Sequence, residues 1–287
     1  MFKNSNRSKI SVRFLYIMLA VCLLAVCSFA IGLGRELYIN NRSRSYYTSL
    51  TSNIETRPRN PLAATSAVKS ATTTAAPGSA DQTADSLPIT SDEAEWVVVD
   101  DWLPYVDFDS LDEQFRGISA WIQLEGTLLD YPIMQWTDNS YFLSHLSDGT
   151  SHRSGSIFLD YRNNADFTDI NTLIYGHTSR YDDMFGILKH YREQSFYEEH
   201  PVMYIFTPQA DYVLELFAGY VLDSGRETPP MDFADSEAFE EHIADIKSRS
   251  VFRSDDEVGA GDRIVSLCTC AYDYSNARLV IVGKLVP

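Results

Sequence analysis

The chain has 287 residues, of which 45% are hydrophobic and 13% are aromatic. This composition excludes wholesale disorder, and the length allows one sizeable domain with accessory segments. Charge is unevenly distributed: residues 1–44 hold seven basic side chains and one acidic one, while the remaining 243 residues hold 16 basic and 39 acidic ones. The acidic part repels nucleic acid, so we expect no nucleic-acid partner, and plain solubility is the simplest use of its charge.

An uncharged apolar run of twenty residues begins at Phe14. At about 1.5 Å per residue it crosses the roughly 30 Å hydrocarbon layer of a bilayer, so we expect a transmembrane signal-anchor over residues 14–34. Basic residues without an acidic one precede it, which predicts a cytoplasmic N-terminus at 1–13 and a single-pass protein of the cell membrane with its globular part extracellular. Two alternatives stay open, a cleaved signal peptide and a lipid attached at Cys22 or Cys27.

The segment after the apolar run is rich in Ser, Thr, Ala and Pro, most clearly from Thr48 to Ser91. It holds too few large apolar residues to order itself. We therefore expect a flexible stalk over residues 35–91 and a folded domain over residues 92–287, which opens with aromatic and β-branched residues at Trp96.

Short runs of β-branched and aromatic residues, separated by turn-rich pieces, dominate the folded part. We expect eight strands, over residues 120–124, 130–135, 155–159, 172–175, 202–207, 212–223, 263–270 and 278–285. Eight strands in so short a domain favour a mainly β fold, a closed barrel with a few peripheral helices.

Three segments predict those helices. Ser110 and Glu113 form a capping pattern ahead of a short helix, and residues 184–191 predict a second one. The third covers residues 235–248, where acidic residues precede apolar ones at helical spacing, namely Phe239, Ile243 and Ile246.

The C-terminal segment has the clearest chemical meaning. A strand ends at Cys270, and a second strand begins at Arg278 after a turn. A hairpin folded about Tyr274 puts Cys270 opposite Arg278. A nearby cation favours the thiolate that attacks carbonyl carbons, and a guanidinium also stabilises an oxyanion. Taken alone, the hairpin is also compatible with a buried strand cysteine and a surface arginine.

His177 directly follows a predicted strand, after a glycine, Gly176, that allows the backbone to bend. A loop histidine at the end of a strand is well placed for acid and base catalysis. The other five histidines show no ligand spacing with one another or with the cysteines, so we expect no metal site. Thiolate, imidazole and guanidinium together need no cofactor.

These residues together resemble the sortase family. The run Ser266-Leu267-Cys268-Thr269-Cys270, followed by Arg278, is similar to the family signature Thr-Leu-x-Thr-Cys and its downstream arginine. Tyr175-Gly176-His177 is similar to the segment that holds the family's histidine. This chain departs from the pattern at Ser266, which replaces the signature threonine, and at Cys268, a position that is often serine.

Four middle segments resemble class B sortases in particular: Trp121-Ile122, Asp130-Tyr131-Pro132-Ile133, Asp138-Asn139-Ser140-Tyr141-Phe142-Leu143 and Gly155-Ser156-Ile157-Phe158-Leu159-Asp160-Tyr161-Arg162-Asn163. The helix expected at residues 235–248 also fits class B, so the resemblance covers nearly all of residues 105–287. It implies the sortase-type β-barrel.

The resemblance further implies an extracellular cysteine transpeptidase with Cys270 as nucleophile, His177 as general acid and base, and Arg278 as oxyanion partner. It would cleave a surface protein at a C-terminal sorting signal, Asn-Pro-x-Thr-Asn or Ser/Asn-Pro-x-Thr-Gly, after the threonine and through a thioester. The acceptor would be an amine of a peptidoglycan stem peptide or of its lipid-linked precursor. The residues expected to line the substrate groove are Asn139, Leu143 and Thr269.

Other possibilities stay open. The chain could be a pilin-polymerising sortase with a lysine acceptor, or a catalytically inactive surface-binding domain, and Leu143 could be an ordinary core residue. Cys268 and Cys270 are two residues apart on a strand, with Cα atoms about 6.6 Å apart, near the long end for a disulfide. We hypothesise that a strained bond between them silences the enzyme under oxidation.

Overall fold

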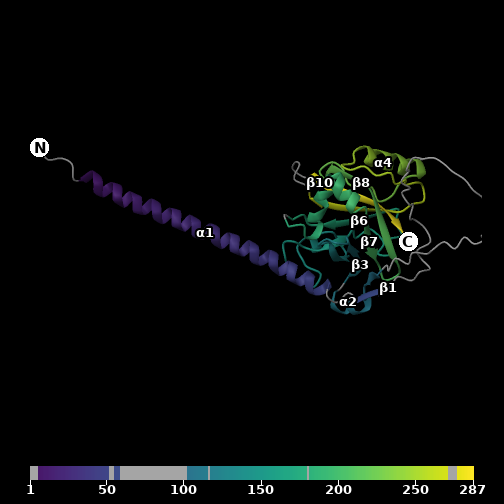
Figure 1. Ribbon diagram of the computed structural model, residues 1–287, viewed down its shortest axis with the longest axis horizontal. Coiled ribbons are helices and arrows are strands. Elements are labelled where there is room, and N and C mark those ends of the chain that lie inside the picture. Colours follow the sequence, from purple (N-terminus) through teal and green to yellow (C-terminus); the bar gives the residue numbers. More distant parts are fainter. Residues whose placement is uncertain (1–5, 52–54, 59–101, 116, 180, 271–276) are drawn as a thin grey trace, which may run out of the picture. The chain divides into compact units, whose positions relative to one another are not determined.

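The computed structural model describes residues 6–51, 55–58, 102–115, 117–179, 181–270 and 277–287. Eight strands form one closed barrel in the order β10-β8-β7-β3-β4-β5-β6-β9. Figure 1 labels β3, β6, β7, β8 and β10 of this barrel. They are β3 (Ile118–Gln123), β4 (Asp130–Met134), β5 (Ile157–Leu159), β6 (Asn171–Gly176), β7 (Val202–Phe206), β8 (Asp211–Asp223), β9 (Ile264–Cys270) and β10 (Ala277–Val286). Every strand expected from the sequence is present within two residues of its predicted bounds, and the mainly β barrel is confirmed.

The pairing of β9 with its two neighbours decides which residues meet at the end of the barrel. Most neighbouring strands are antiparallel, but β4 and β5 are parallel, and so are β6 and β9. In the second pair Tyr175 lies beside Cys268, and Gly176 lies beside Thr269. On its other side β9 is antiparallel to β10. The ends of β6 and β9 and the start of β10 therefore lie together.

The helix expected before the last strands is confirmed as α4 (Ser236–Ser248). The side chain of Asp235 accepts a hydrogen bond from the backbone N–H of Ala238 and caps its N-terminus. The apolar residues of α4 pack on the outer face of the barrel, against Tyr220 of β8, Cys268 of β9 and Val280 of β10. The helix α4 therefore covers part of the outer face of β8, β9 and β10, close to the strand ends described above.

The other expected helices are also present, with one change of boundary. The segment after β6 forms a 3₁₀ helix, η2 (Met184–Arg192). The short helix α2 (Phe108–Gln114) begins before the predicted cap, because the side chain of Asp107 accepts a hydrogen bond from the backbone N–H of Ser110 and serves as the N-cap. Two short helices were not predicted, η1 (Tyr141–Leu143) and α3 (Gln194–Glu199).

The N-terminal helix α1 (Asn6–Thr51) contains the apolar segment Phe14–Arg35, which is long and apolar enough to cross a membrane. It does not end there (Figure 1). Residues 35–51 are helical where a flexible stalk was expected, because Tyr47 and Leu50 in the last turns are buried and packed. Polar composition predicted disorder, but tertiary contacts stabilise the helix.

Most of the remaining stalk, with Trp96, lies outside the described residues. Two short strands are described, β1 (Glu55–Pro58) within the predicted stalk and β2 (Trp102–Tyr105) within the predicted folded domain, and they pair with each other in a separate antiparallel sheet. Residues 55–58 are therefore strand, although they fall within the segment where the sequence predicted a stalk.

Candidate active site

Three neighbouring strands bring the expected catalytic residues to one end of the barrel. Gly176 and Thr269 are partners in the parallel pair, and His177 and Cys270 are the next residues along the two chain segments. On the opposite side of β9, Cys270 is the direct partner of Arg278. Adjacent strands lie roughly 4.8 Å apart, so the backbones of Cys270 and Arg278 lie about one strand spacing from each other. The structure describes the backbone of Cys270 but not its side chain.

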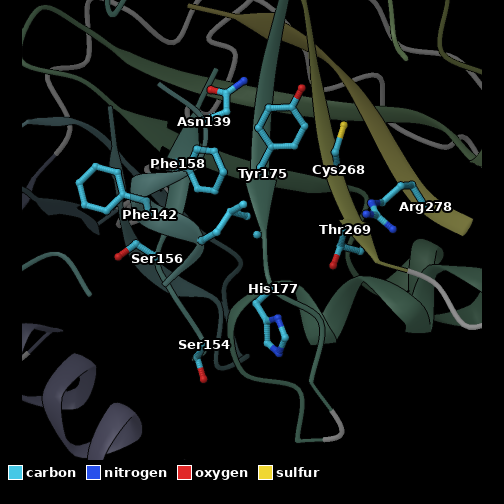
Figure 2. A pocket seen from close by; sticks show the side chains of 12 residues that line it. Asn139, Phe142, Ser154, Ser156, Phe158, Tyr175, His177, Cys268, Thr269 and Arg278 are labelled. Carbon is cyan, nitrogen blue, oxygen red and sulfur yellow. The ribbon is translucent and has the colours of Figure 1, made fainter. Parts of the chain in front are cut away.

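An open cleft with a volume of about 270 Å³ lies beside these strand ends (Figure 2). Its lining residues are Asn139, Phe142, Leu143, Ser154, Ser156, Phe158, Tyr175, Gly176, His177, Cys268, Thr269 and Arg278. All three residues expected to line the substrate groove are among them. Leu143 is 61% exposed, so it is not a core residue. Aromatic side chains form one side of the cleft, and the imidazole and guanidinium lie at the other.

Sequence reasoning did not single out the aromatic lining or the two serines. Phe158 and Tyr175 lie on strands β5 and β6, with ring centroids 5.4 Å apart. Strand alternation shows which residues share a face but not which face borders a cleft. The signal that could have found Tyr175 is its position two residues before His177, on the same side of β6.

His177 lies at the end of β6 and is exposed to the cleft (Figure 2). Partial burial of the ring lowers the pKa of His177, the negative charge of Asp183 opposes that shift, and the charge of Arg153 adds to it. The backbone carbonyl of His177 accepts a hydrogen bond from Phe185 N at 3.1 Å, which fixes the loop. At neutral pH the imidazole is therefore largely uncharged.

The glycine before His177 is needed for space rather than for bending. A Cβ atom on Gly176 would lie 2.5 Å from the ring of Phe185, which is fully buried. The ring packs directly on the backbone of the strand end and holds the histidine segment against η2. Any larger residue at this position would displace the ring or the strand.

Arg278 reaches from β10 to the end of β9 (Figure 2). Its guanidinium is half-buried, and Nη1 donates to the backbone carbonyl of Ala277 at 3.1 Å. Across the described parts of the chain no carboxylate forms an ion pair with it. A planar cation whose remaining donors face the cleft is suited to stabilise a developing oxyanion.

A buried carboxylate supports the wall of the cleft opposite His177. Asp160 is fully buried and accepts hydrogen bonds from the side chains of Arg162, Asn139 and Tyr175, with N···O or O···O distances of 2.8, 3.0 and 3.1 Å to Oδ2. Burial alone would raise the pKa of Asp160, but the hydrogen bonds from Arg162 and Asn139 outweigh it, and the pKa is lowered. Asp160 thus stays charged and fixes Asn139 and Tyr175 in the wall.

Cys268 differs sharply from a nucleophile. It is a free thiol, 4% exposed, and its sulfur lies 3.7 Å from the backbone carbonyl of Ser266. Burial raises the pKa of Cys268 to about 12, although the charge of Arg278 opposes the shift. Little thiolate forms at this position at neutral pH. The hypothesis of an inhibitory disulfide with Cys270 stays a prediction.

Known proteins with matching sequence and structure belong to one family. A family model described as the sortase domain matches residues 122–286. Sortase B of Listeria monocytogenes is 37% identical over 173 residues, which cover 60% of this chain and 70% of that protein. Sortase B of Staphylococcus aureus is 34% identical over 181 residues, or 62% of this chain and 74% of that protein.

Solved structures give the same result. A Staphylococcus aureus sortase B–substrate complex has 34% sequence identity and a TM-score of 0.59, covering 62% of this chain and 84% of that chain. A sortase B complexed with triglycine has 34% identity and a TM-score of 0.59, covering 62% and 85%. Clostridium perfringens sortase B has 31% identity and a TM-score of 0.59, covering 63% and 100%.

Proposed function

This chain belongs to the sortase family of cysteine transpeptidases and matches its sortase B members, and from that premise we propose that Cys270, His177 and Arg278 perform the transfer. The observation that supports this assignment is the strand register. It puts His177 one residue beyond the Gly176–Thr269 pair and puts Arg278 directly opposite Cys270, beside an open cleft. Residues distant in the sequence thereby converge where a peptide has access.

In the first half of the reaction the Cys270 thiolate attacks the carbonyl carbon of the threonine in the sorting signal. The guanidinium of Arg278 stabilises the negative charge that develops on the carbonyl oxygen. The C–N bond to the next residue then breaks, and protonated His177 donates its proton to the departing amine. A thioester to the threonine carbonyl remains on Cys270.

In the second half an acceptor amine attacks the thioester carbon. Neutral His177 takes a proton from the amine, the C–S bond breaks, and Cys270 leaves as the thiolate. An amide bond then joins the threonine to the acceptor. Each step has its proton donor or acceptor in the protein, so the transfer needs no further reactant.

The pKa of His177 determines what fraction of the enzyme carries both a thiolate on Cys270 and an imidazolium on His177. A thiol has an ordinary pKa of about 8.5, above that of a partly buried imidazole. The pair of thiolate and imidazolium is therefore a minor form at neutral pH. Asp183 increases its population because its negative charge raises the pKa of His177 against the effect of burial.

The cleft supports a substrate that is apolar at one end and polar at the other. Phe142, Leu143 and Phe158 offer an apolar surface suited to the proline ring of an Asn-Pro-x-Thr or Ser-Pro-x-Thr segment. The threonine carbonyl would then lie at the other end, by Thr269 and Arg278. Asn139, held by Asp160, would contact the first residue of the signal.

We also propose the cellular arrangement. The segment Phe14–Arg35 would cross the membrane, with residues 1–13 in the cytoplasm and the barrel outside. Residues 59–91 would form what remains of the stalk, ahead of the catalytic domain at 92–287. The acceptor would be an amine of the cell-wall peptidoglycan or of its lipid-linked precursor, and short glycine peptides are suitable probes because a relative forms a complex with triglycine.

The test uses the full chain in detergent micelles with a panel of peptides that carry Asn-Pro-x-Thr-Asn, Asn-Pro-x-Thr-Gly or Ser-Pro-x-Thr-Gly, with triglycine as acceptor. We expect cleavage after threonine and a new threonine–glycine amide, both identified by mass spectrometry. Cys270→Ala should abolish both products, and Cys268→Ala is the matched control that should retain them. Undiminished transfer by Cys270→Ala, or no cleavage of any peptide by the folded wild type, would overturn the proposal.

A further inference from the structure

The last turns of α1 contact two segments that form the active site. Arg44 Nη2 donates to the backbone carbonyl of Tyr181 at 2.9 Å, and its guanidinium lies 5.6 Å from the centre of that ring. Tyr181 belongs to the loop that links His177 to η2. The helix that contains the membrane-spanning candidate thus holds the segment that follows the catalytic histidine.

The second contact is to the wall of the cleft. The ring of Tyr47 is 4% exposed and packs edge-on against Tyr131 of β4, with centroids 4.8 Å apart. Its hydroxyl lies 3.2 Å from Ser156 Oγ and 3.4 Å from the carbonyl of Gly155. Ser156 Oγ also donates to the carbonyl of His145 at 2.9 Å, so the hydroxyls of Tyr47 and Ser156 form one hydrogen-bond network with the carbonyls of Gly155 and His145.

The segment that Tyr47 holds is tightly joined to the groove. Gly155 has a φ of +59°, and a Cβ atom there would lie 2.2 Å from the carbonyl oxygen of Phe142. The backbone N–H of Ser156 donates to the same carbonyl at 2.9 Å. Ser156, Phe142 and the neighbouring Leu143 all line the cleft. A displacement of Ser156 therefore also displaces the apolar surface proposed to bind the signal.

We propose that the end of α1 is part of the active-site scaffold, and that Tyr47 is a positioning residue for the peptide groove. It acts through Ser156 and touches no reacting atom. The membrane anchor and the substrate groove would then share one continuous helix. This inference rests on the proposed peptide transfer.

The neighbouring Tyr46 provides a matched control. Its hydroxyl also bonds to the barrel domain, at 2.8 Å from Ser147 Oγ, but Ser147 does not line the cleft. Both tyrosines belong to the same turn, and each substitution by phenylalanine removes one hydroxyl while keeping the ring. A merely structural role predicts similar effects of the two changes, whereas a positioning role predicts that they differ.

The test compares Tyr47→Phe with Tyr46→Phe in the full chain in detergent. We expect Tyr47→Phe to raise KM for the peptide about two- to tenfold, the size of one lost hydrogen bond, with kcat and the pH profile unchanged. Tyr46→Phe should leave KM unchanged. Equal KM values for the two variants, raised or not, would overturn the inference while leaving the proposed transfer intact.

A second measurement does not depend on turnover. Amide hydrogen exchange should become faster over residues 154–156 in Tyr47→Phe and stay at the wild-type rate there in Tyr46→Phe, whose hydroxyl contacts Ser147 instead. Unchanged exchange in this segment would contradict the positioning role even if the wild type transferred no peptide, an outcome that would overturn the proposed function separately.

Discussion

Two parts of one barrel face differ in what covers them. Around Cys268 the outer face of β9 and β10 is buried under α4, and its neighbours include Phe239, Ile243 and Val280. Two residues further along, the same strands reach the open end, where His177 and the cleft lie. The burial of Cys268 holds its thiol protonated. The comparison teaches that burial makes Cys268 a poor nucleophile, although it lines the same cleft as His177 and Arg278.

The strongest expected difference lies in the reactivity of the two thiols. With a pKa raised to about 12, Cys268 has on the order of a thousandfold less thiolate at neutral pH than an ordinary thiol of pKa about 8.5. Iodoacetamide should therefore modify Cys270 far faster, as measured by peptide mapping. In guanidinium chloride the two rates should converge. Equal rates in the folded protein would remove the distinction between the two positions.

The covered part should matter mainly for stability. Phe239 is 3% exposed in α4, so Phe239→Ala should lower the free energy of unfolding by about 3–5 kcal/mol, measured by urea denaturation. The exposed neighbour Glu240 is the control, and Glu240→Ala should change it by less than about 0.5 kcal/mol. The folded fraction of Phe239→Ala should keep its kcat/KM, and a loss of activity without a loss of stability would contradict this division.

The open end should matter mainly for catalysis. Arg278→Ala should lower kcat/KM about 10²- to 10³-fold, as expected when one oxyanion donor is removed. The unfolding midpoint should hardly change, because the guanidinium is half-buried and its one described hydrogen bond is to the adjacent carbonyl of Ala277. Arg278→Lys keeps the charge without the planar fork and should restore only part of the rate. Full activity of Arg278→Ala would exclude the oxyanion role.

The smallest effect is expected at Asp183, a largely buried residue whose negative charge acts on His177. Its charge raises the pKa of His177, so Asp183→Asn should lower that pKa further. The acid limb of the kcat/KM profile should then move to lower pH, and the plateau should fall severalfold because less imidazolium coexists with thiolate. Ser179→Ala, which removes a hydroxyl bonded to Asp183 but keeps the carboxylate, is the control. If the acid limb of Asp183→Asn stays in place, Asp183 does not raise the pKa of His177.

Much of the fold follows from local patterns. Alternating and β-branched runs located all eight strands, and helical spacing located α4. The short helices η1 and α3 were missed because three and six residues hold too little periodicity. The length of α1 was missed because Tyr47 and Leu50 are stabilised by a surface formed elsewhere in the chain. Helix propensity depends on the local sequence, so it cannot predict a helix end that tertiary contacts stabilise.

The candidate site also combines features that local sequence patterns predict with features that depend on tertiary structure. A hairpin centred on Tyr274 predicts Cys270 opposite Arg278, and the strand register confirms this pair. The place of His177 beside Cys270 depends on the parallel pairing of β6 with β9, and these strands are nearly ninety residues apart. No local pattern specifies that pairing, so only the resemblance to sortases linked the three residues. The support from Asp160 and Tyr47 is likewise tertiary, and no local pattern shows what either side chain contacts.

The most direct test is to trap the thioester and locate it. The full chain, mixed with a sorting-signal peptide without acceptor amine, is quenched in acid and digested, and the modified peptide is identified by mass spectrometry. The account predicts that the acyl group is attached at Cys270 and is absent from Cys270→Ala. An acyl group on Cys268, or an adduct that persists in Cys270→Ala, would contradict it.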